Sequence, residues 1–292
     1  MESYAFAGAT APGLPAGFVA VTLLAALLHA TWNAMAHAVD DRLLGFALIG
    51  VSYTVVGGAG AALLGLPPSS AWPFVLSSAA LHVVYILLLL AGFQLGEFGQ
   101  VYPLARGTAP WLVAVLEIVV LGRTLPAWQL AGVCVVSAGL VGLAVGGGRP
   151  SRARLPALAA AMATGVSIAA YTVVDAQAVA TTDVLVYASW MFLLQGPALP
   201  LLVLAVRGRG LRAGVRRSTV ISGLTGGVVS LLAYGLVLWA QTSGATAAVA
   251  ALRESSIVFG AIIGALVLKE PFGRSRIVAS VVVTLGIVLI NL

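Results

Sequence analysis

Residues 72–93 read WPFVLSSAALHVVYILLLLAGF and contain no Asp, Glu, Lys or Arg. A helix needs about 20 mainly apolar residues to cross the hydrocarbon core of a bilayer, so this stretch has the length and composition of a transmembrane helix. The rest of the chain is similar, because 61% of the 292 residues are hydrophobic and only 8% are charged. A soluble domain has about 25% charged residues, so this composition excludes a soluble globule.

The chain parses into ten such apolar runs, at residues 15–37, 43–66, 72–93, 99–121, 127–147, 155–177, 184–206, 218–240, 245–268 and 273–291. In lipid the backbone must satisfy its hydrogen bonds within a helix or in a closed barrel, and these runs exceed the roughly 10 residues of a barrel strand. We therefore expect an all-α integral membrane protein with ten transmembrane helices.

The basic residues indicate how the chain is oriented. They lie between the apolar runs rather than on one hydrophilic surface, which argues against nucleic-acid binding despite the net charge of +6. One set of alternate loops contains twelve of the fifteen Lys and Arg residues, whereas the opposite loops and the termini contain only Arg123. Because short cytoplasmic loops are rich in Lys and Arg, both termini are predicted to be extracytoplasmic.

A connector rich in Gly, Pro and Arg at residues 146–154 divides the chain into two five-helix repeats, at residues 1–148 and 149–292. A shift of 147 positions lays Arg106 on Arg253. Because each repeat has an odd number of helices, the second is expected to be inverted relative to the first. Many secondary transporters have this plan, with the substrate site at the interface between the repeats.

Four ionisable side chains lie within predicted helices, namely Arg106, Glu117, Arg253 and Glu254. Such a charge costs at least about 2.5–3.5 kcal/mol on insertion scales, so it normally faces the interior of the bundle. Two guanidinium groups near one cavity would bind a carboxylate or phosphate, and both arginines are therefore predicted to bind substrate. The alternative is that each pairs with a buried carboxylate and locks helices together. Glu117 and Glu254 are the predicted coupling residues if transport uses a proton or cation gradient.

Polar and aromatic side chains are predicted to shape the cavity. His29 and Asn33 share a face of the first helix, with Trp32 beside them. His82 and Tyr85 are three positions apart on another helix. Both groups either line the cavity or form hydrogen bonds between helices. The predicted substrate-binding set also includes Tyr102, Tyr171 and Tyr234.

Motifs for enzyme chemistry are missing from the sequence. It contains no His-Glu-x-x-His zinc motif, no phosphate-binding loop with Gly-Lys-Ser/Thr and no Gly-x-Ser-x-Gly elbow. Cys134 is the only cysteine, and His29 and His37 are about 12 Å apart along one helix, too far to hold one ion. We expect no catalytic residue, no metal and no cofactor.

The sequence resembles the drug/metabolite transporter superfamily, with its paired EamA-type repeats, in segments that include Leu28-His29-Ala-Thr-Trp32-Asn33, Val101-Tyr-Pro-Leu-Ala-Arg106-Gly-Thr-Ala-Pro110 and Ala251-Leu-Arg253-Glu254-Ser-Ser256. It resembles most a branch labelled as phosphonate-utilisation-associated membrane proteins. The resemblance implies a multi-pass transporter of the bacterial cytoplasmic (inner) membrane.

Together these features predict a secondary transporter that exports a small polar, anionic metabolite by alternating access. Two alternatives stay open: uptake of phosphonate-like compounds, and a membrane-embedded enzyme acting on an anionic substrate. The expected partners are the small-molecule substrate, the lipid bilayer and a coupling proton or cation. The protein is not expected to bind nucleic acid. Its oligomeric state is expected to be a monomer or a homodimer.

Overall fold

The computed structural model describes residues 14–37, 39, 41–96, 98–145, 155–208, 216–266 and 274–290. Over these ranges the chain forms helices and no strand. The helices are α1 (Ala16–His37), α2 (Arg42–Leu64), η1 (Ser69–Ala71), α3 (Trp72–Leu95), α4 (Phe98–Val119), α5 (Ala127–Val145), α6 (Leu155–Val179), α7 (Val184–Gln195), α8 (Ala198–Arg207), α9 (Arg217–Gln241), α10 (Thr246–Arg253), α11 (Ser256–Leu266) and α12 (Arg274–Ile290).

Within the described ranges, six segments are long and apolar enough to cross a membrane, judged by length and composition. They are Ala16–Ala36, Arg42–Leu64, Ser69–Gly92, Leu155–Val179, Val184–Arg207 and Arg217–Gln241. The apolar parts of α5 and α12 are shorter. The predicted all-α membrane fold is thus confirmed at this level, and the connector at residues 146–154 lies outside the described residues.

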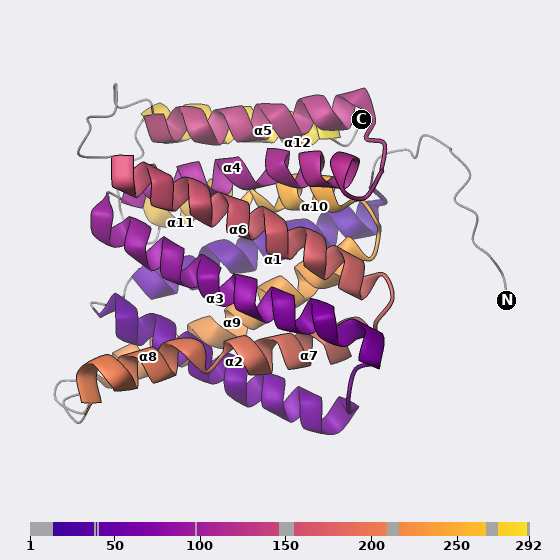
Figure 1. Ribbon diagram of the computed structural model, residues 1–292. Helices are drawn as coiled ribbons and strands as arrows, with labels where there is room; N and C mark the ends of the chain where they lie inside the picture. The colour runs from indigo at the N-terminus through magenta and orange to yellow at the C-terminus, as the bar shows by residue number, and fades with distance from the viewer. Residues whose placement is uncertain are drawn as a thin grey trace, which may run out of the picture.

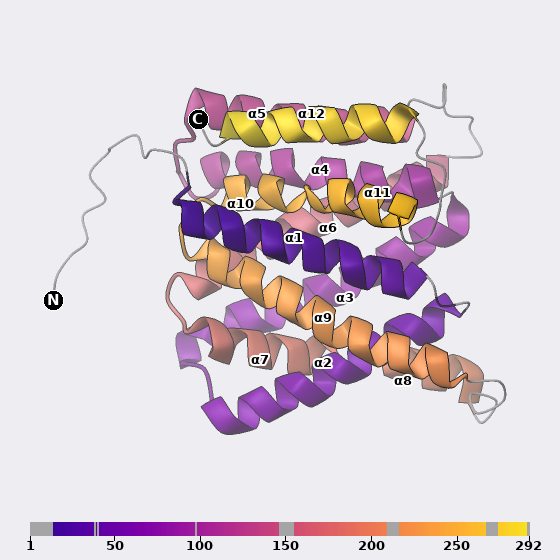
Figure 2. The ribbon, with the colours of Figure 1, turned by 180° about the vertical axis from the view of Figure 1, so that it is seen from behind.

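The bundle is built in layers (Figures 1 and 2). The pair α5 and α12 covers one side, and α2 with α7 and α8 covers the opposite side. Between them, α3 packs on α6, and α1 packs on α9. The short helices α10 and α11 follow one another beside α4, between the α5–α12 pair and α1. The middle layers therefore bring helices from both halves of the chain together.

Two helices that the sequence predicts as continuous are interrupted. The first break separates α7 from α8 at Gly196-Pro197, where the proline ring removes a backbone donor. The second separates α10 from α11 at Glu254-Ser255. There the amide of Glu254 donates to Ala251 O at 3.1 Å, a tighter turn than that of an α-helix. By contrast, α4 stays one helix with Pro103 and Pro110 inside it.

Close packing of α2 on α7 depends on Gly57. A Cβ atom added at this glycine would lie 2.6 Å from the backbone nitrogen of Leu193 and 2.8 Å from the carbonyl oxygen of Ser189. Both atoms belong to the α7 backbone and have little room to move. At the neighbouring Gly58, an added Cβ would meet only the side chain of Leu193, at 3.5 Å.

Gly57→Ala is therefore expected to lower the unfolding temperature of the detergent-solubilised protein, because overpacking at a tight contact costs about 1–3 kcal/mol. Gly58→Ala is the matched control. It adds the same methyl group to the same helix without the clash, and alanine favours helix by about 1 kcal/mol over glycine. Equal unfolding temperatures for the two variants would contradict this description of the contact.

Asp41 joins the beginning of α2 to the end of α8. Its carboxylate accepts from the Leu44 amide at 3.1 Å, which caps α2, and receives two bonds from the Arg207 guanidinium, one from Nη2 to Oδ1 at 3.0 Å. The hydrogen bond from Arg207 is the largest cause that holds the pKa of Asp41 below its usual 3.8. Folding thus gains stability from the ionised carboxylate above the unfolded pKa and loses it as the pH falls through the lowered value.

We expect Arg207→Gln to destabilise the protein at neutral pH by no more than about 1 kcal/mol, since the pair is partly exposed. The difference from wild type should shrink as the pH falls through the folded pKa of Asp41, because the protonated carboxyl no longer attracts the guanidinium. Unfolding temperatures measured across acidic pH test this. A difference that stays constant with pH would exclude an ionic contribution.

Candidate functional site

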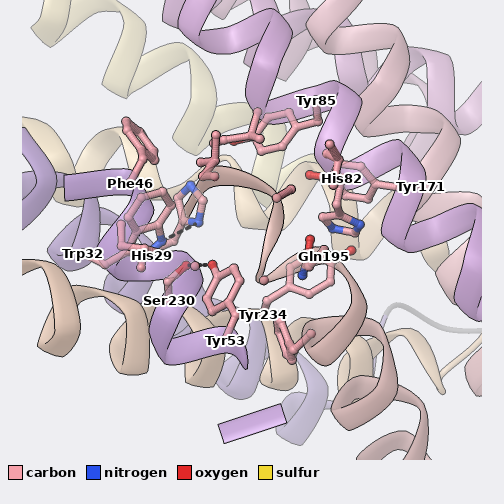
Figure 3. A pocket seen from close by; sticks show the side chains of 18 of the residues that line it. His29, Trp32, Phe46, Tyr53, His82, Tyr85, Tyr171, Gln195, Ser230 and Tyr234 are labelled. Carbon is pink, nitrogen blue, oxygen red and sulfur yellow. Dashed lines mark hydrogen bonds between the residues drawn. The ribbon is translucent and has the colours of Figure 1, made fainter. Parts of the chain in front are cut away.

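A cavity lies in the middle of the bundle, between helices from both halves of the chain (Figure 3). Its volume, counted as space for the centres of water-sized spheres, is about 90 Å³, several times the roughly 10–15 Å³ that one water needs by this measure. Of the predicted site residues, those that line it are His29, Trp32, His82, Tyr85, Tyr171, Tyr234 and Arg253. Asn33, Tyr102 and Arg106 are not among the lining residues.

One wall is formed by α1. Trp32 Nε1 donates to His29 Nδ1 at 3.2 Å, so this nitrogen of His29 accepts, and the proton of the neutral ring is on Nε2. Asn33 Nδ2 donates to the His29 carbonyl at 2.8 Å, within its own helix. Of the three residues predicted to share this face, His29 and Trp32 line the cavity, whereas Asn33 forms a hydrogen bond within its own helix.

The opposite wall is aromatic. The His82 ring stacks on Tyr171 with centroids 3.9 Å apart, and Tyr234 meets both rings edge-on at 5.1 and 6.0 Å. His82 Nδ1 lies 2.9 Å from the Ser78 carbonyl oxygen, which can only accept, so Nδ1 donates. Tyr85 lies edge-on to Tyr171 at 5.7 Å. Figure 3 shows His82 and Tyr171 on the far side of the cavity from His29 and Trp32.

Arg253, the last residue of α10, lines the cavity and is 3% exposed. Its Nε and Nη2 atoms are buried and have no hydrogen-bond partner among the residues that the structure describes. A buried guanidinium without an acceptor is unfavourable, because its donors lose water and gain nothing in return. Arg253 is therefore a cationic residue of the cavity lining whose Nε and Nη2 have no acceptor within the described residues.

Arg106 is in a different position from Arg253. Its Nε donates to Glu254 Oε2 at 2.8 Å, and its Nη2 lies 3.4 Å from Ser256 Oγ. Both members of the ion pair are buried. The Arg106 guanidinium carbon is 6.0 Å from the centre of the Tyr102 ring. The pair connects the middle of α4 to the break between α10 and α11, so Glu254 neutralises Arg106 rather than its neighbour Arg253.

Comparison with known proteins indicates which class of protein the chain is similar to. Residues 155–292 match the EamA-like transporter family. Members of this family are transporters, and the match supports the resemblance to the drug/metabolite transporter superfamily. With the apolar helices, it supports a multi-pass membrane protein of the transporter class. The phosphonate-associated branch stays a prediction.

The fold is similar to that of proteins of known structure. One of them, described only as "Crystal structure of protein", superposes with a TM-score of 0.76 at 19% identity. The similarity covers 94% of this chain and 98% of the other. At this identity the likeness concerns the fold alone. Among curated proteins, none matches the chain.

Glu117 stabilises the beginning of α10. Its Oε2 accepts from the backbone amide of Ala247 at 2.8 Å, and its Oε1 accepts from Arg123 Nη1 at 3.1 Å. A carboxylate at this place satisfies a free amide and interacts favourably with the positive end of the helix dipole. Glu117 is 1% exposed and is not among the lining residues of the cavity. Its contacts thus fix the helix that ends at Arg253.

Three polar lining residues were not predicted from the sequence, namely Tyr53, Gln195 and Ser230. The Tyr53 hydroxyl and Ser230 Oγ are 2.6 Å apart and link α2 to α9. Ser230 precedes Tyr234 by four positions on α9, so the predicted Tyr234 was a signal for this face. Gln195 is the last residue of α7, just before the Gly196-Pro197 break. Its place at a helix end within an apolar run was the only feature that could have indicated it as a site residue.

Proposed function

We propose that this protein is a secondary transporter that moves a small anionic metabolite through the central cavity, with Arg253 as the anion-binding residue. The observation that carries the proposal is the buried, cavity-lining guanidinium with two unused donors. A carboxylate, phosphate or phosphonate group would accept from Nε and Nη2 together, in the forked geometry for which arginine is suited.

The charge balance around the cavity supports an anion. Arg106 and Glu254 neutralise one another at 2.8 Å, which leaves Arg253 as the cation in the lining. Arg106 has a positioning role in this proposal, since its contact with Glu254 holds the α10–α11 break in place. The remaining lining is aromatic and weakly polar, as expected of a site that encloses a small organic molecule.

The packing pattern supports two inverted repeats. If α1 corresponds to α6, α3 to α9, and α4 to α10 with α11, then the contact of α1 with α9 corresponds to that of α3 with α6. The contact of α4 with α6 likewise corresponds to that of α1 with α10 and α11. In this proposal α7 with α8, and α10 with α11, count as single spans, so that each repeat has five helices. Such repeats can rock about a central site and expose it alternately to each side.

We retain export as the expected direction and extracytoplasmic termini as the expected topology. Uptake of phosphonate-like compounds is the alternative. Fusing a reporter that is active on only one side of the membrane to the C-terminus tests the topology, and activity on the cytoplasmic side would reverse it.

A binding screen on the purified protein tests the chemical class of the substrate. Inorganic phosphate, methylphosphonate and succinate are each titrated while the unfolding temperature is followed, with tetramethylammonium chloride and glycerol as comparisons. A ligand that binds only the folded state adds about 2.7 kcal/mol of stability at 100 times its Kd. Saturable stabilisation by one of the anions is expected. Stabilisation by tetramethylammonium and by none of the anions would overturn the assignment of charge.

A further inference from the structure

Asp175, on α6, is a buried carboxyl without a basic partner. It is 0% exposed. Its Oδ1 accepts from the Tyr187 hydroxyl of α7 at 2.6 Å, and its Oδ2 accepts from the Tyr234 hydroxyl of α9. Within the described residues it makes no ion pair. Hydroxyl donors compensate only part of the cost of burying a carboxylate.

The other buried acidic residues of the described chain differ from Asp175. Glu254 pairs with Arg106, and Glu117 pairs with Arg123. A proton on Glu254 would leave the buried Arg106 without its counter-charge, which is strongly unfavourable. A proton on Glu117 would break its ion pair with the partly exposed Arg123 and weaken its bond from the Ala247 amide. Protonation of Asp175 breaks no ion pair, and it leaves two neutral tyrosines in place. This contrast singles out Asp175 among the three.

Tyr234 lines the cavity (Figure 3). Because its hydroxyl also donates to the Asp175 carboxylate, it connects Asp175 to the cavity. The titratable and charged groups on the elements that surround Asp175 include His82 and Tyr85 of α3, Tyr102, Arg106 and Glu117 of α4, Tyr171 of α6 itself, Tyr187 of α7, Tyr234 of α9 and Arg253 of α10. Arg106 and Glu117 are engaged in their own ion pairs. Arg253 and Asp175 both lie within electrostatic range of His82 and Tyr234.

We propose that Asp175 is a proton-binding site coupled to the anion site at Arg253 through the hydroxyl of Tyr234. This inference rests on the proposed transport function and names its coupling ion and coupling residue. When Asp175 is ionised, both tyrosine hydroxyls donate to the carboxylate. When it binds one proton, the carboxyl becomes neutral and a donor itself, and the Tyr234 hydroxyl is released to donate into the cavity.

The coupling has a definite sign. One proton is taken up and none is released, so the region beside the cavity loses one negative charge. An anion at Arg253 is then attracted more strongly, and it gains Tyr234 as a further donor. Proton and anion therefore favour one another's binding, which by linkage is reciprocal. The net direction of flux follows the sum of the two gradients.

The first test detects proton binding to Asp175 in the absence of substrate. Infrared difference spectra of the protein in liposomes are recorded between neutral and acidic pH. We expect a carbonyl band of a protonated, slowly exchanging carboxyl that Asp175→Asn lacks. If that variant fails to fold, an Asp40→Asn protein labelled with ¹³C at the aspartate carboxyl serves instead, because the other two labelled residues, Asp41 and Asp183, cap helices near the surface and exchange rapidly. A buried carboxyl band that neither the variant nor the label alters would overturn the assignment of Asp175.

The second test measures the coupling between proton binding and anion binding. The probe is methanesulfonate, because its charge does not change with pH. In wild type, acidification is expected to raise its affinity about fivefold or more, the usual minimum for coupled sites. Asp175→Asn should bind equally well at both pH values, near the acidic wild-type affinity. Tyr234→Phe should keep the infrared band but show a reduced pH effect. A pH-independent wild-type affinity would refute coupling, whereas absence of binding by every anion would refute the proposed function and leave the infrared result standing.

Discussion

Arg253→Gln is expected to lower the affinity of the cavity for anions by about 10- to 100-fold. Hydrogen bonds to a charged group contribute about 1.5–3 kcal/mol, and each 1.4 kcal/mol is a factor of ten in affinity. Arg253→Lys should lie between the variant and wild type, because lysine keeps the charge and loses the forked pair of donors. Affinities are measured by the same thermal titration of phosphate, methylphosphonate and succinate.

Stability distinguishes this effect from a folding defect. Since Nε and Nη2 of Arg253 have no partner among the described residues, removing the charge should leave the unfolding temperature unchanged or raise it, as for residues kept for function at the expense of stability. Arg42→Gln is the matched control. It removes the same charge from an exposed position at the beginning of α2 and should leave affinity unchanged. Wild-type affinity in a folded Arg253→Gln protein would exclude Arg253 from the site.

Unlike Arg253→Gln, the variant Arg106→Leu is expected to lose much of its stability. It leaves the Glu254 carboxylate buried, at 0% exposure, without its cation. Removing one partner of a buried ion pair typically costs about 3–5 kcal/mol. Glu254→Leu should be similarly destabilising, because it leaves Arg106 unpaired. The unfolding temperatures of the two variants in detergent are the measurement.

The double variant Arg106→Leu/Glu254→Leu completes the cycle. Replacing a buried pair by apolar residues is often neutral or stabilising, so we expect the double variant to unfold near wild type. A double variant as unstable as the sum of the two single variants would mean that the residues act independently. In that case Arg106 would have to be reconsidered as a second substrate-binding cation.

The sequence was sufficient to predict most of the helices because apolar runs such as residues 72–93 have only one stable form in lipid. It failed at the break between α10 and α11, since Glu254 and Ser255 carry no proline or glycine to mark an end. By contrast, α4 stays one helix with two prolines inside it, because neighbouring segments can satisfy the backbone groups that proline leaves free in a membrane.

The candidate site could be predicted in part. Helical spacing indicated that His29 and Trp32 belong to one face, and both line the cavity. Spacing contains no information on partners that are distant in the chain, so it could not show that Arg106 would meet Glu254 and that Arg253 would remain unpaired. For the same reason it could not show that packing against α7 and α9 would bury Asp175 completely.

A counterflow experiment in sealed liposomes tests whether the protein carries an anion across the membrane by way of Arg253. Liposomes containing the purified protein are loaded with an excess of the unlabelled anion that binds best among phosphate, methylphosphonate and succinate, and a trace of the labelled anion is added outside. A transporter is predicted to accumulate the unchanged label transiently, and Arg253→Gln should accumulate little. If none of the three anions enters faster than into protein-free liposomes, the account is contradicted.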